Sequence, residues 1–174
     1  RLVKHKGVDI LIAAAQTVLA RFPNAYFLIV GDGELLNPLK QQAIQQGNET
    51  RIIFTGGRSD VEELLACMDV FVSPSFWEGL PTVVLESMAS GVPVIATRIP
   101  GSTDLIQHQI NGWLTSPGDS IDLAQTIQLT IENPDLRQEY AKCAQQVLKT
   151  FSINAIAAEY EQIYSAAIVS HYTT

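Results

Sequence analysis

Short apolar runs alternate with longer segments of helical periodicity along most of this chain. The clearest pair is the helical pattern of residues 8–22 and the apolar run AYFLIV of residues 25–30. Later runs have the same strand-like character, at residues 51–56, 69–75, 92–97 and 112–117. Strands that are apolar on both faces and alternate with helices are typical of a parallel sheet covered by helices on both sides. The sequence therefore predicts an α/β fold with a doubly wound parallel sheet.

The last part of the chain has no strand pattern and is predicted to be helical throughout. Its helical segments follow one another directly, at residues 120–133, 134–151 and 152–168. No repeat or linker interrupts the chain, and 174 residues are enough to bury a core without disulfides. We expect residues 1–174 to form one domain with a helical C-terminal tail. Because the chain starts without Met and residues 1–3 resemble the end of a strand, we also expect it to be a fragment of a longer protein.

The composition excludes several classes of partner. Hydrophobic residues make up 47% and charged residues 17% of the chain, as in an ordinary globular protein. The formal net charge is −7, so we expect no basic surface that attracts nucleic acid or anionic lipid. No apolar run reaches the length of about 18 residues that a membrane span needs, and no signal peptide is visible. We expect a cytoplasmic protein with no membrane segment in this fragment and no nucleic-acid partner.

Loops that follow predicted strands are the candidates for a ligand site, and they lie at residues 31–33, 56–58 and 75–81. In open parallel sheets, ligands bind beyond the carboxyl ends of the strands, where helix N-termini offer unpaired N–H groups. After the last of these loops, Pro81 suits the first turn of a helix. The N–H groups of Thr82, Val83 and Val84 should then be free, and such a helix start is suited to bind a phosphate.

Two glutamates flank this helix start, with seven residues between them. Glu78 lies on the loop, and Gly79 beside it allows the backbone to approach a ligand closely. Glu86 lies in an otherwise apolar helical segment, where we expect it to be buried and where an unpaired charge would be costly. Most carboxylates are simply surface groups, and that is the alternative interpretation of both. We favour a site in which Glu86 binds a vicinal diol such as a ribose and both glutamates open onto one hollow.

These residues resemble the two-glutamate signature of the family 4 retaining glycosyltransferases (glycosyl transferases group 1), which use nucleotide sugars and have the GT-B fold. Other segments match the C-terminal half of that family in order and spacing: RLVKHKG (1–7), LIVGDGE (28–34), FTGGRSD (54–60), MDVFVSPSFWEGLP (68–81), ASGVPVIAT (89–97) and NGWLTSPGD (111–119). The resemblance covers nearly the whole chain. It implies a Rossmann-like domain, the donor-binding C-terminal half of a GT-B enzyme.

The resemblance also implies roles for individual residues. Arg1 and Lys6 match the basic pair that grips the donor diphosphate. Glu86 matches the acid that holds the nucleotide ribose. Glu78 matches the acid near the hydroxyls of the donor sugar, which makes it the candidate catalytic residue. The other donor-binding candidates match positions around the base, sugar and phosphate: Gly31, Gly33, Arg58, Gly79, Leu80, Thr82 and Val83.

Some positions depart from the family pattern or leave the interpretation open. Many relatives have Gly where this chain has Pro81, so one backbone N–H donor is absent and the identity of the donor stays open. Trp77, next to Glu78, suits either a sugar pocket or core packing. His5, His108 and His171 are scattered and have no partner at metal-ligand spacing, so we expect no metal and no other cofactor.

The function that the resemblance implies is transfer of a sugar, such as a hexose, from a UDP- or GDP-sugar to an acceptor. The anomeric configuration would be retained, and no metal would be needed. The acceptor, a glycan, a lipid or a small molecule, would bind against an N-terminal domain that this chain lacks. We therefore expect the fragment to bind a nucleotide sugar and to transfer nothing by itself. Two alternatives stay open: a GT-B epimerase, and a nucleotide-sugar-binding module without transferase activity.

Overall fold

A computed structural model describes residues 1–172 of the chain. Its elements follow in the order η1 (Lys4–Lys6), α1 (Val8–Arg21), β1 (Phe27–Val30), α2 (Leu36–Gln45), β2 (Ile52–Gly56), α3 (Val61–Ala66), β3 (Phe71–Ser73), α4 (Thr82–Ala89), β4 (Val94–Thr97), β5 (Trp113–Thr115), α5 (Ser120–Glu132), α6 (Pro134–Val147), η2 (Leu148–Phe151) and α7 (Ile153–Tyr172). Strands and helices alternate through β4, as the sequence predicts, and the last segments are all helical.

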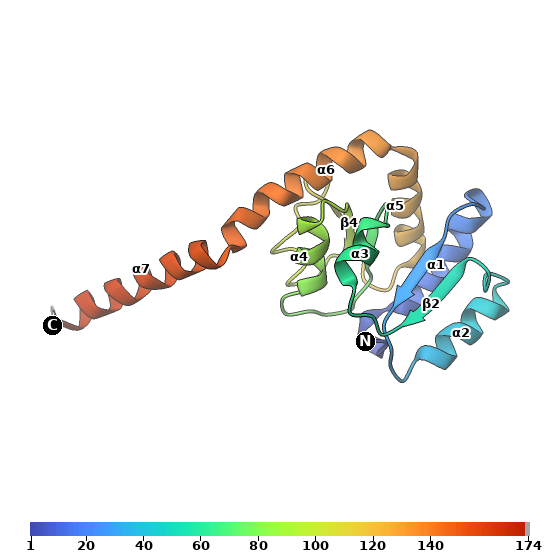
Figure 1. Ribbon diagram of the computed structural model, residues 1–174, viewed down its shortest axis with the longest axis horizontal. Helices are drawn as coiled ribbons and strands as arrows, with labels where there is room; N and C mark the ends of the chain where they lie inside the picture. Colours follow the sequence, from blue (N-terminus) through green and yellow to red (C-terminus); the bar gives the residue numbers. More distant parts are fainter. Residues whose placement is uncertain (173–174) are drawn as a thin grey trace.

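All strand pairs are parallel, which confirms the predicted sheet type (Figure 1). The strands form two sheets, however: β1 pairs with β2, and β3, β4 and β5 pair in that order. No strand of the described residues joins β1 to β3, so each of these two strands keeps one edge without a partner. The predicted fold class is therefore confirmed, with the parallel strands divided between two sheets.

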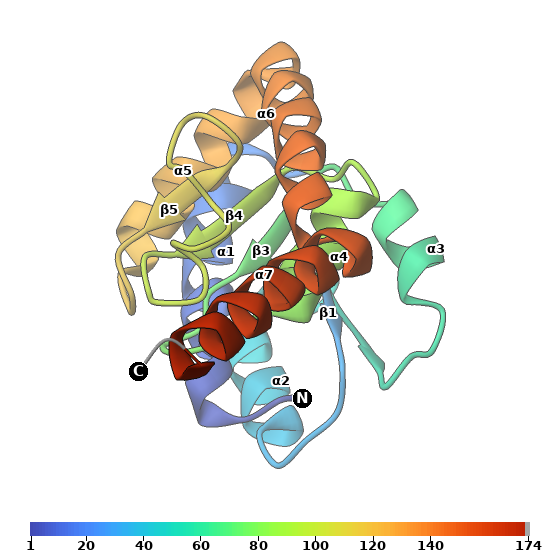
Figure 2. The ribbon, with the colours of Figure 1, turned by 90° about the vertical axis from the view of Figure 1, so that its left-hand side faces the viewer.

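The central strand β4 shows how both faces of the larger sheet are covered. All four of its residues are buried, and the first three side chains alternate between two hydrophobic clusters. Ile95 packs into the cluster that contains α1 and α5, whereas Val94 and Ala96 pack into the cluster that contains Val84 and Met88 of α4. Figure 2 shows α1 and α5 on one side of β4 and α4 on the other. Helices thus cover both faces, as a doubly wound fold requires.

Residues 2–7 connect the carboxyl ends of the two sheets. The N–H of Leu2 donates to the carbonyl of Asp32, after β1, over 2.9 Å. The carbonyl of His5 accepts a hydrogen bond of 2.7 Å from the N–H of Phe76, after β3. The prediction that residues 1–3 end a strand is therefore wrong, because they form an irregular segment and then the 3-10 turn η1.

The C-terminal helices leave the body of the molecule. Figure 1 shows α7 extending away from the sheets beyond α6. None of its described side chains, at residues 153–168, belongs to either hydrophobic cluster, and Ile153, Tyr160 and Ile163 are exposed. None of the helices in the described part of the chain combines the length and the apolar character that a bilayer crossing requires. The predicted helical tail is confirmed.

Gly7 tests how strongly the fold depends on the approach of residues 2–7 to the loop after β3. Its φ is 62°, and a Cβ there would lie 2.1 Å from the carbonyl oxygen of Pro74. We expect Gly7→Ala to lower the free energy of unfolding by about 1 kcal/mol for the left-handed backbone, and by about 1–3 kcal/mol more for the clash. Urea unfolding followed by tryptophan fluorescence measures this loss.

Gly47→Ala is the matched control for this substitution. Gly47 has a φ of 69°, but a Cβ there would have nothing within 4 Å. This variant should show only the backbone cost of about 1 kcal/mol. Equal losses in the two variants would mean that the contact between Gly7 and Pro74 contributes nothing to stability.

Candidate functional site

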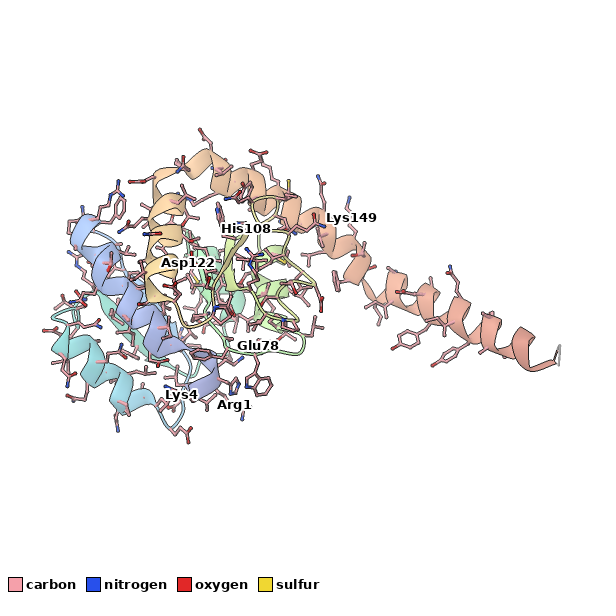
Figure 3. The ribbon with its side chains drawn as sticks, turned by 180° about the vertical axis from the view of Figure 1, so that it is seen from behind. Arg1, Lys4, Glu78, His108, Asp122 and Lys149 are labelled. Carbon is pink, nitrogen blue, oxygen red and sulfur yellow. The ribbon has the colours of Figure 1, made fainter. Side chains whose placement is uncertain are left out.

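Glu78 is held at the carboxyl end of the larger sheet, on the loop between β3 and α4. Its Oε1 accepts a hydrogen bond of 2.5 Å from Nζ of Lys6 and one of 2.8 Å from Oγ of Ser75. The Glu78 side chain is only 13% exposed. Figure 3 labels Glu78 together with Arg1 and Lys4, and all three lie at the same end of the molecule. The structure therefore brings together Lys6 and Glu78, two predicted site residues that are 72 positions apart in the chain.

The environment of Glu78 favours its charged form. Burial acts to raise the pKa of this carboxyl group, but hydrogen bonds from Lys6 and Ser75 act against burial. The nearby charges of Lys6 and His5 lower the pKa as well, and the net result is a pKa below the ordinary glutamate value. Glu78 is thus set up as a fixed carboxylate rather than as a proton donor near neutral pH.

Thr97 and Gly101, which were not predicted as site residues, fix the loop that carries Glu78. The buried hydroxyl of Thr97, at the end of β4, donates to the carbonyl of Ser75. Gly101 packs against the loop so closely that a Cβ there would lie 2.2 Å from the carbonyl oxygen of Gly79. The Pro100-Gly101 pair is typical of a turn, but its contact with Gly79 depends on the tertiary fold and cannot be predicted from local sequence.

Helix α4 begins beside this loop, with Pro81 as its N-cap residue. Within residues 1–172, the N–H groups of Thr82 and Val83 have no hydrogen-bond partner, whereas the N–H of Val84 donates to the carbonyl of Pro81 over 2.9 Å. The prediction that Val84 offers a free N–H is therefore wrong, because the first turn of the helix is tight. Leu80 and Val83 are exposed. Two N–H groups remain available at the positive end of the helix dipole.

Glu86 lines a hollow of about 390 Å³ between α4 and the start of α3, together with Ser59, Asp60, Val61, Glu62 and Glu63. The prediction that Glu86 is buried is wrong, since its side chain is exposed at the rim of this hollow. Glu78 does not line the hollow, so the two glutamates do not share one cavity as expected. Helix α4 instead separates two neighbouring features, the ion pair at its start and the hollow beside its middle.

Arg58 is exposed, next to the same hollow. Its guanidinium group binds the carboxylate of Asp60 with two hydrogen bonds, of 2.8 and 2.5 Å. The hydrogen bonds and the charge of Asp60 raise the pKa of Arg58, and the Arg58 side chain lowers the pKa of Asp60. This pair fixes the loop that leads from β2 into α3, which forms one wall of the hollow.

The glycine turn after β1 contacts the N-terminal segment. A Cβ on Gly33 would lie 2.5 Å from the carbonyl oxygen of Leu2, and a Cβ on Gly31 would lie 3.7 Å from the backbone nitrogen of Arg1. The side chain of Arg1 is exposed. The turn thus places Arg1 and the segment leading to Lys6 at the same edge as Glu78. The residues that the structure describes hold no group of three or more His, Cys, Asp or Glu side chains that could bind a metal ion.

The sequence model of one protein family, described as glycosyl transferases group 1, matches residues 1–147 of the chain. The chain belongs to the glycosyl transferases group 1 family. It is 35% identical over 167 residues to the lipopolysaccharide core biosynthesis glycosyltransferase LpsE of Rhizobium meliloti, a match that covers 95% of this chain and 48% of that protein. It is 36% identical over 162 residues to the N-acetyl-alpha-D-glucosaminyl L-malate synthase of Bacillus anthracis, covering 92% of this chain and 42% of that protein. The chain thus spans less than half the length of these members of the family.

Solved structures of glycosyltransferases share the fold. The Anabaena protein Alr3699/HepE, in a complex with UDP, superposes with a TM-score of 0.89 and 32% identity, over 95% of this chain and 47% of that one. The C-terminal domain of a group 1 family protein, LpcC of Francisella tularensis, superposes with a TM-score of 0.79 and 30% identity, over 88% of this chain and 83% of that one. These matches confirm the Rossmann-like, GT-B architecture expected for the family.

The lowered pKa of Glu78 predicts how the stability of this glycosyltransferase domain depends on pH. Because the pKa is lower in the folded state than in the unfolded state, the charged carboxylate stabilises the fold at neutral pH. This contribution is lost as the pH falls below the ordinary glutamate pKa of about 4.3. We expect Glu78→Gln to lower the free energy of unfolding by about 1 kcal/mol at pH 7, and the difference from the wild type to shrink in acid.

Thermal unfolding of both proteins over a series of pH values measures this effect. Glu161→Gln, at an exposed position of α7, is the control and should leave the stability unchanged at every pH. A loss that stays constant down to acid pH would show that the charge of Glu78 does not contribute to stability.

Proposed function

We propose that this domain binds the nucleotide diphosphate sugar for a retaining, metal-independent glycosyltransferase. The observation that carries the proposal is the Lys6–Glu78 pair beside the start of α4, where two backbone N–H groups are free. The ammonium group of Lys6 and the helix N-terminus suit the negative diphosphate, and the carboxylate of Glu78 suits the hydroxyl groups of the sugar. The UDP complex of the related Anabaena protein supports the same class of ligand.

The diphosphate is proposed to bind at the N–H groups of Thr82 and Val83. Backbone N–H groups and the helix dipole both favour an anion at this point. Lys6 adds a positive charge, and Arg1 adds a second one from the exposed N-terminal segment. When the bond between the anomeric carbon and the diphosphate breaks, the electron pair goes to the diphosphate oxygen. Fixed positive charges that face this oxygen stabilise the transition state, and they fill the role that a metal ion has in other transferases.

The nucleoside is proposed to bind in the hollow beside the middle of α4. Its volume of about 390 Å³ falls within the range of about 300–1,000 Å³ that is typical of small-molecule sites. Glu86 at its rim is an acceptor for the two ribose hydroxyl groups. The loop that Arg58 and Asp60 stabilise forms the wall on the side of the base. Helix α4 would then place the ribose and the diphosphate on consecutive turns.

Glu78 is proposed to change partners when the donor binds. Lys6 is already neutralised by Glu78, so an incoming diphosphate competes with this carboxylate for the ammonium group. Once Lys6 turns to the diphosphate, Glu78 is free to accept hydrogen bonds from the sugar hydroxyls. The role of Glu78 is to orient the sugar at the reacting carbon. Binding of the complete donor then satisfies both members of the pair, whereas a bare nucleotide leaves the carboxylate without its cation.

The acceptor and the complete reaction belong to the longer enzyme in this proposal. The chain covers 42–48% of the relatives described above, and the LpcC C-terminal domain matches it over most of its own length. We therefore assign residues 1–174 to the C-terminal half, with the acceptor bound against an N-terminal half, in a cytoplasmic enzyme of carbohydrate biosynthesis. The relatives are named as transferases or synthases, which supports transfer over epimerisation or binding alone.

Calorimetric titration of the chain with UDP and GDP tests the nucleotide site. We expect one of them to bind, and Glu86→Ala to weaken that binding by about 1–3 kcal/mol, because a charged hydrogen-bond partner of the ribose is lost. Glu139→Ala, an exposed glutamate of α6, is the matched control and should change nothing. Addition of EDTA should leave the affinity unchanged. Equal affinity of the wild type and Glu86→Ala would place the ribose elsewhere.

An assay of sugar transfer tests the division of labour between the two halves. With UDP-glucose as the donor and a panel of hexosides as acceptors, the isolated chain should release no UDP above the rate of spontaneous hydrolysis. The full-length enzyme should turn over in the same assay. Robust transfer by the isolated chain would contradict the assignment of the acceptor site to another domain.

A further inference from the structure

Trp77 is an exposed aromatic side chain at the edge of the sheet that carries Glu78. It directly precedes Glu78 on the loop after β3, and it is 63% exposed. The sequence left open whether Trp77 packs in the core or shapes a sugar pocket, and this exposure excludes the core. The other tryptophan, Trp113, is the core residue, at 1% exposure. The Trp77 indole is therefore accessible to a ligand, next in the chain to the carboxylate that pairs with Lys6.

The Trp77 ring is held in one orientation by His5. The two rings are stacked, with centroids 4.6 Å apart and planes inclined by 27°. The backbone hydrogen bond from Phe76 to His5 joins the same two segments next to the stack. His5 and Lys6 are adjacent in η1, as Trp77 and Glu78 are on the loop. The ring stack and the ion pair therefore lie side by side, and His5 covers one face of the indole while the other face stays open.

An open indole face beside a carboxylate and an ammonium group has the chemistry of a sugar site. One side of a pyranose ring carries C–H bonds and packs on an aromatic face, while its hydroxyl groups need hydrogen-bond partners. Leu80 and Val83, which follow Glu78 on the loop and in the first turn of α4, are exposed as well. The charged pair is therefore bordered by apolar groups, an arrangement that suits a ligand with both polar and apolar faces.

We propose that the open face of Trp77, held by His5, is a stacking platform for a pyranose ring beside Glu78. The proposal rests on the proposed function, since it assigns a contact for the sugar to the same site. Trp77 is a positioning residue in this assignment: it sets the plane of the ring whose hydroxyl groups Glu78 orients. The pyranose is the donor hexose, because the acceptor is assigned to the N-terminal half of the enzyme.

Quenching of tryptophan fluorescence by acrylamide tests the platform directly in the unmodified chain. Trp113 is buried and escapes the quencher, so the quenchable signal comes from Trp77. We expect UDP-glucose to protect Trp77 from quenching and UDP not to protect it, because the platform takes the donor sugar. Protection by methyl α-D-glucopyranoside in the presence of UDP, and not by UDP-glucose, would show that Trp77 binds a sugar other than the donor and would overturn the proposal. Absence of protection in both arms overturns the proposal.

Substitutions give a second, independent measurement. We expect Trp77→Ala to reduce the affinity for the pyranose ligand by about 2–12-fold, the range for loss of an aromatic contact, and to leave the affinity for UDP unchanged. Trp77→Phe should restore most of the loss, and His5→Ala should show a smaller one. Tyr26→Ala is the matched control, because Tyr26 is 62% exposed and also stacked, on Arg51, yet it lies before the start of β1 at the opposite sheet edge.

The results separate the platform from the nucleotide site. A wild-type chain that binds neither UDP nor GDP refutes the proposed function, and calorimetry shows this without reference to Trp77. A chain that binds UDP but loses UDP and UDP-glucose affinity equally in Trp77→Ala refutes the platform alone, since the residue would then act on the fold of the loop.

Discussion

Residues 2–7 are bonded to the loops at the ends of two separate sheets, and the arrangement of the site depends on these bonds. Leu2 is tied to the turn after β1, and His5 to the loop after β3. Because η1 lies between these points, Lys6 reaches Glu78 without any hydrogen bond between the sheets themselves. Gly7 and Gly33 permit the close approach at either end. The positive and negative groups of the site therefore share one short segment as their common support.

The sequence was sufficient for most of the helices and strands, because they follow from local periodicity, although the strand end expected at residues 1–3 was wrong. The sheet edge that carries Glu78 was predicted from the general geometry of parallel sheets. It was not sufficient for the division into two sheets, since strand pairing is a non-local property. The family resemblance assigned Lys6 and Glu78 to the same donor site, but their ion pair was not predicted, as no spacing rule joins residues so far apart. The error at Glu86 was avoidable: Val84, Ser87 and Met88 are the buried residues of α4, and their helical spacing places Glu86 on another face.

Two cations of the site, Lys6 and Arg58, are each paired with a nearby carboxylate. A protein with a net charge of −7 repels anionic ligands at long range, so attraction for a diphosphate must come from the few groups that touch it. Glu78 forms an ion pair with Lys6, and Asp60 forms one with Arg58. These pairs hold both cations in place, but they also reduce the positive charge that a diphosphate meets. The free N–H groups at the start of α4 carry no such partner. Under the proposed function, we expect selectivity for a complete donor, because only a ligand that also satisfies the displaced carboxylate recovers the cost of separating the pair.

Helix α7 affects how the molecule unfolds. It contains 20 residues, so it extends for about 30 Å, and its described side chains, at residues 153–168, belong to neither hydrophobic cluster. Its melting is therefore only weakly coupled to the loss of the core, as expected for a peripheral element with little buried surface. Far-ultraviolet circular dichroism reports all helical peptide bonds, including those of α7. It would register the unfolding of α7 as an early, shallow transition. Emission from Trp113 would report the later collapse of the sheet, and the two curves would not coincide.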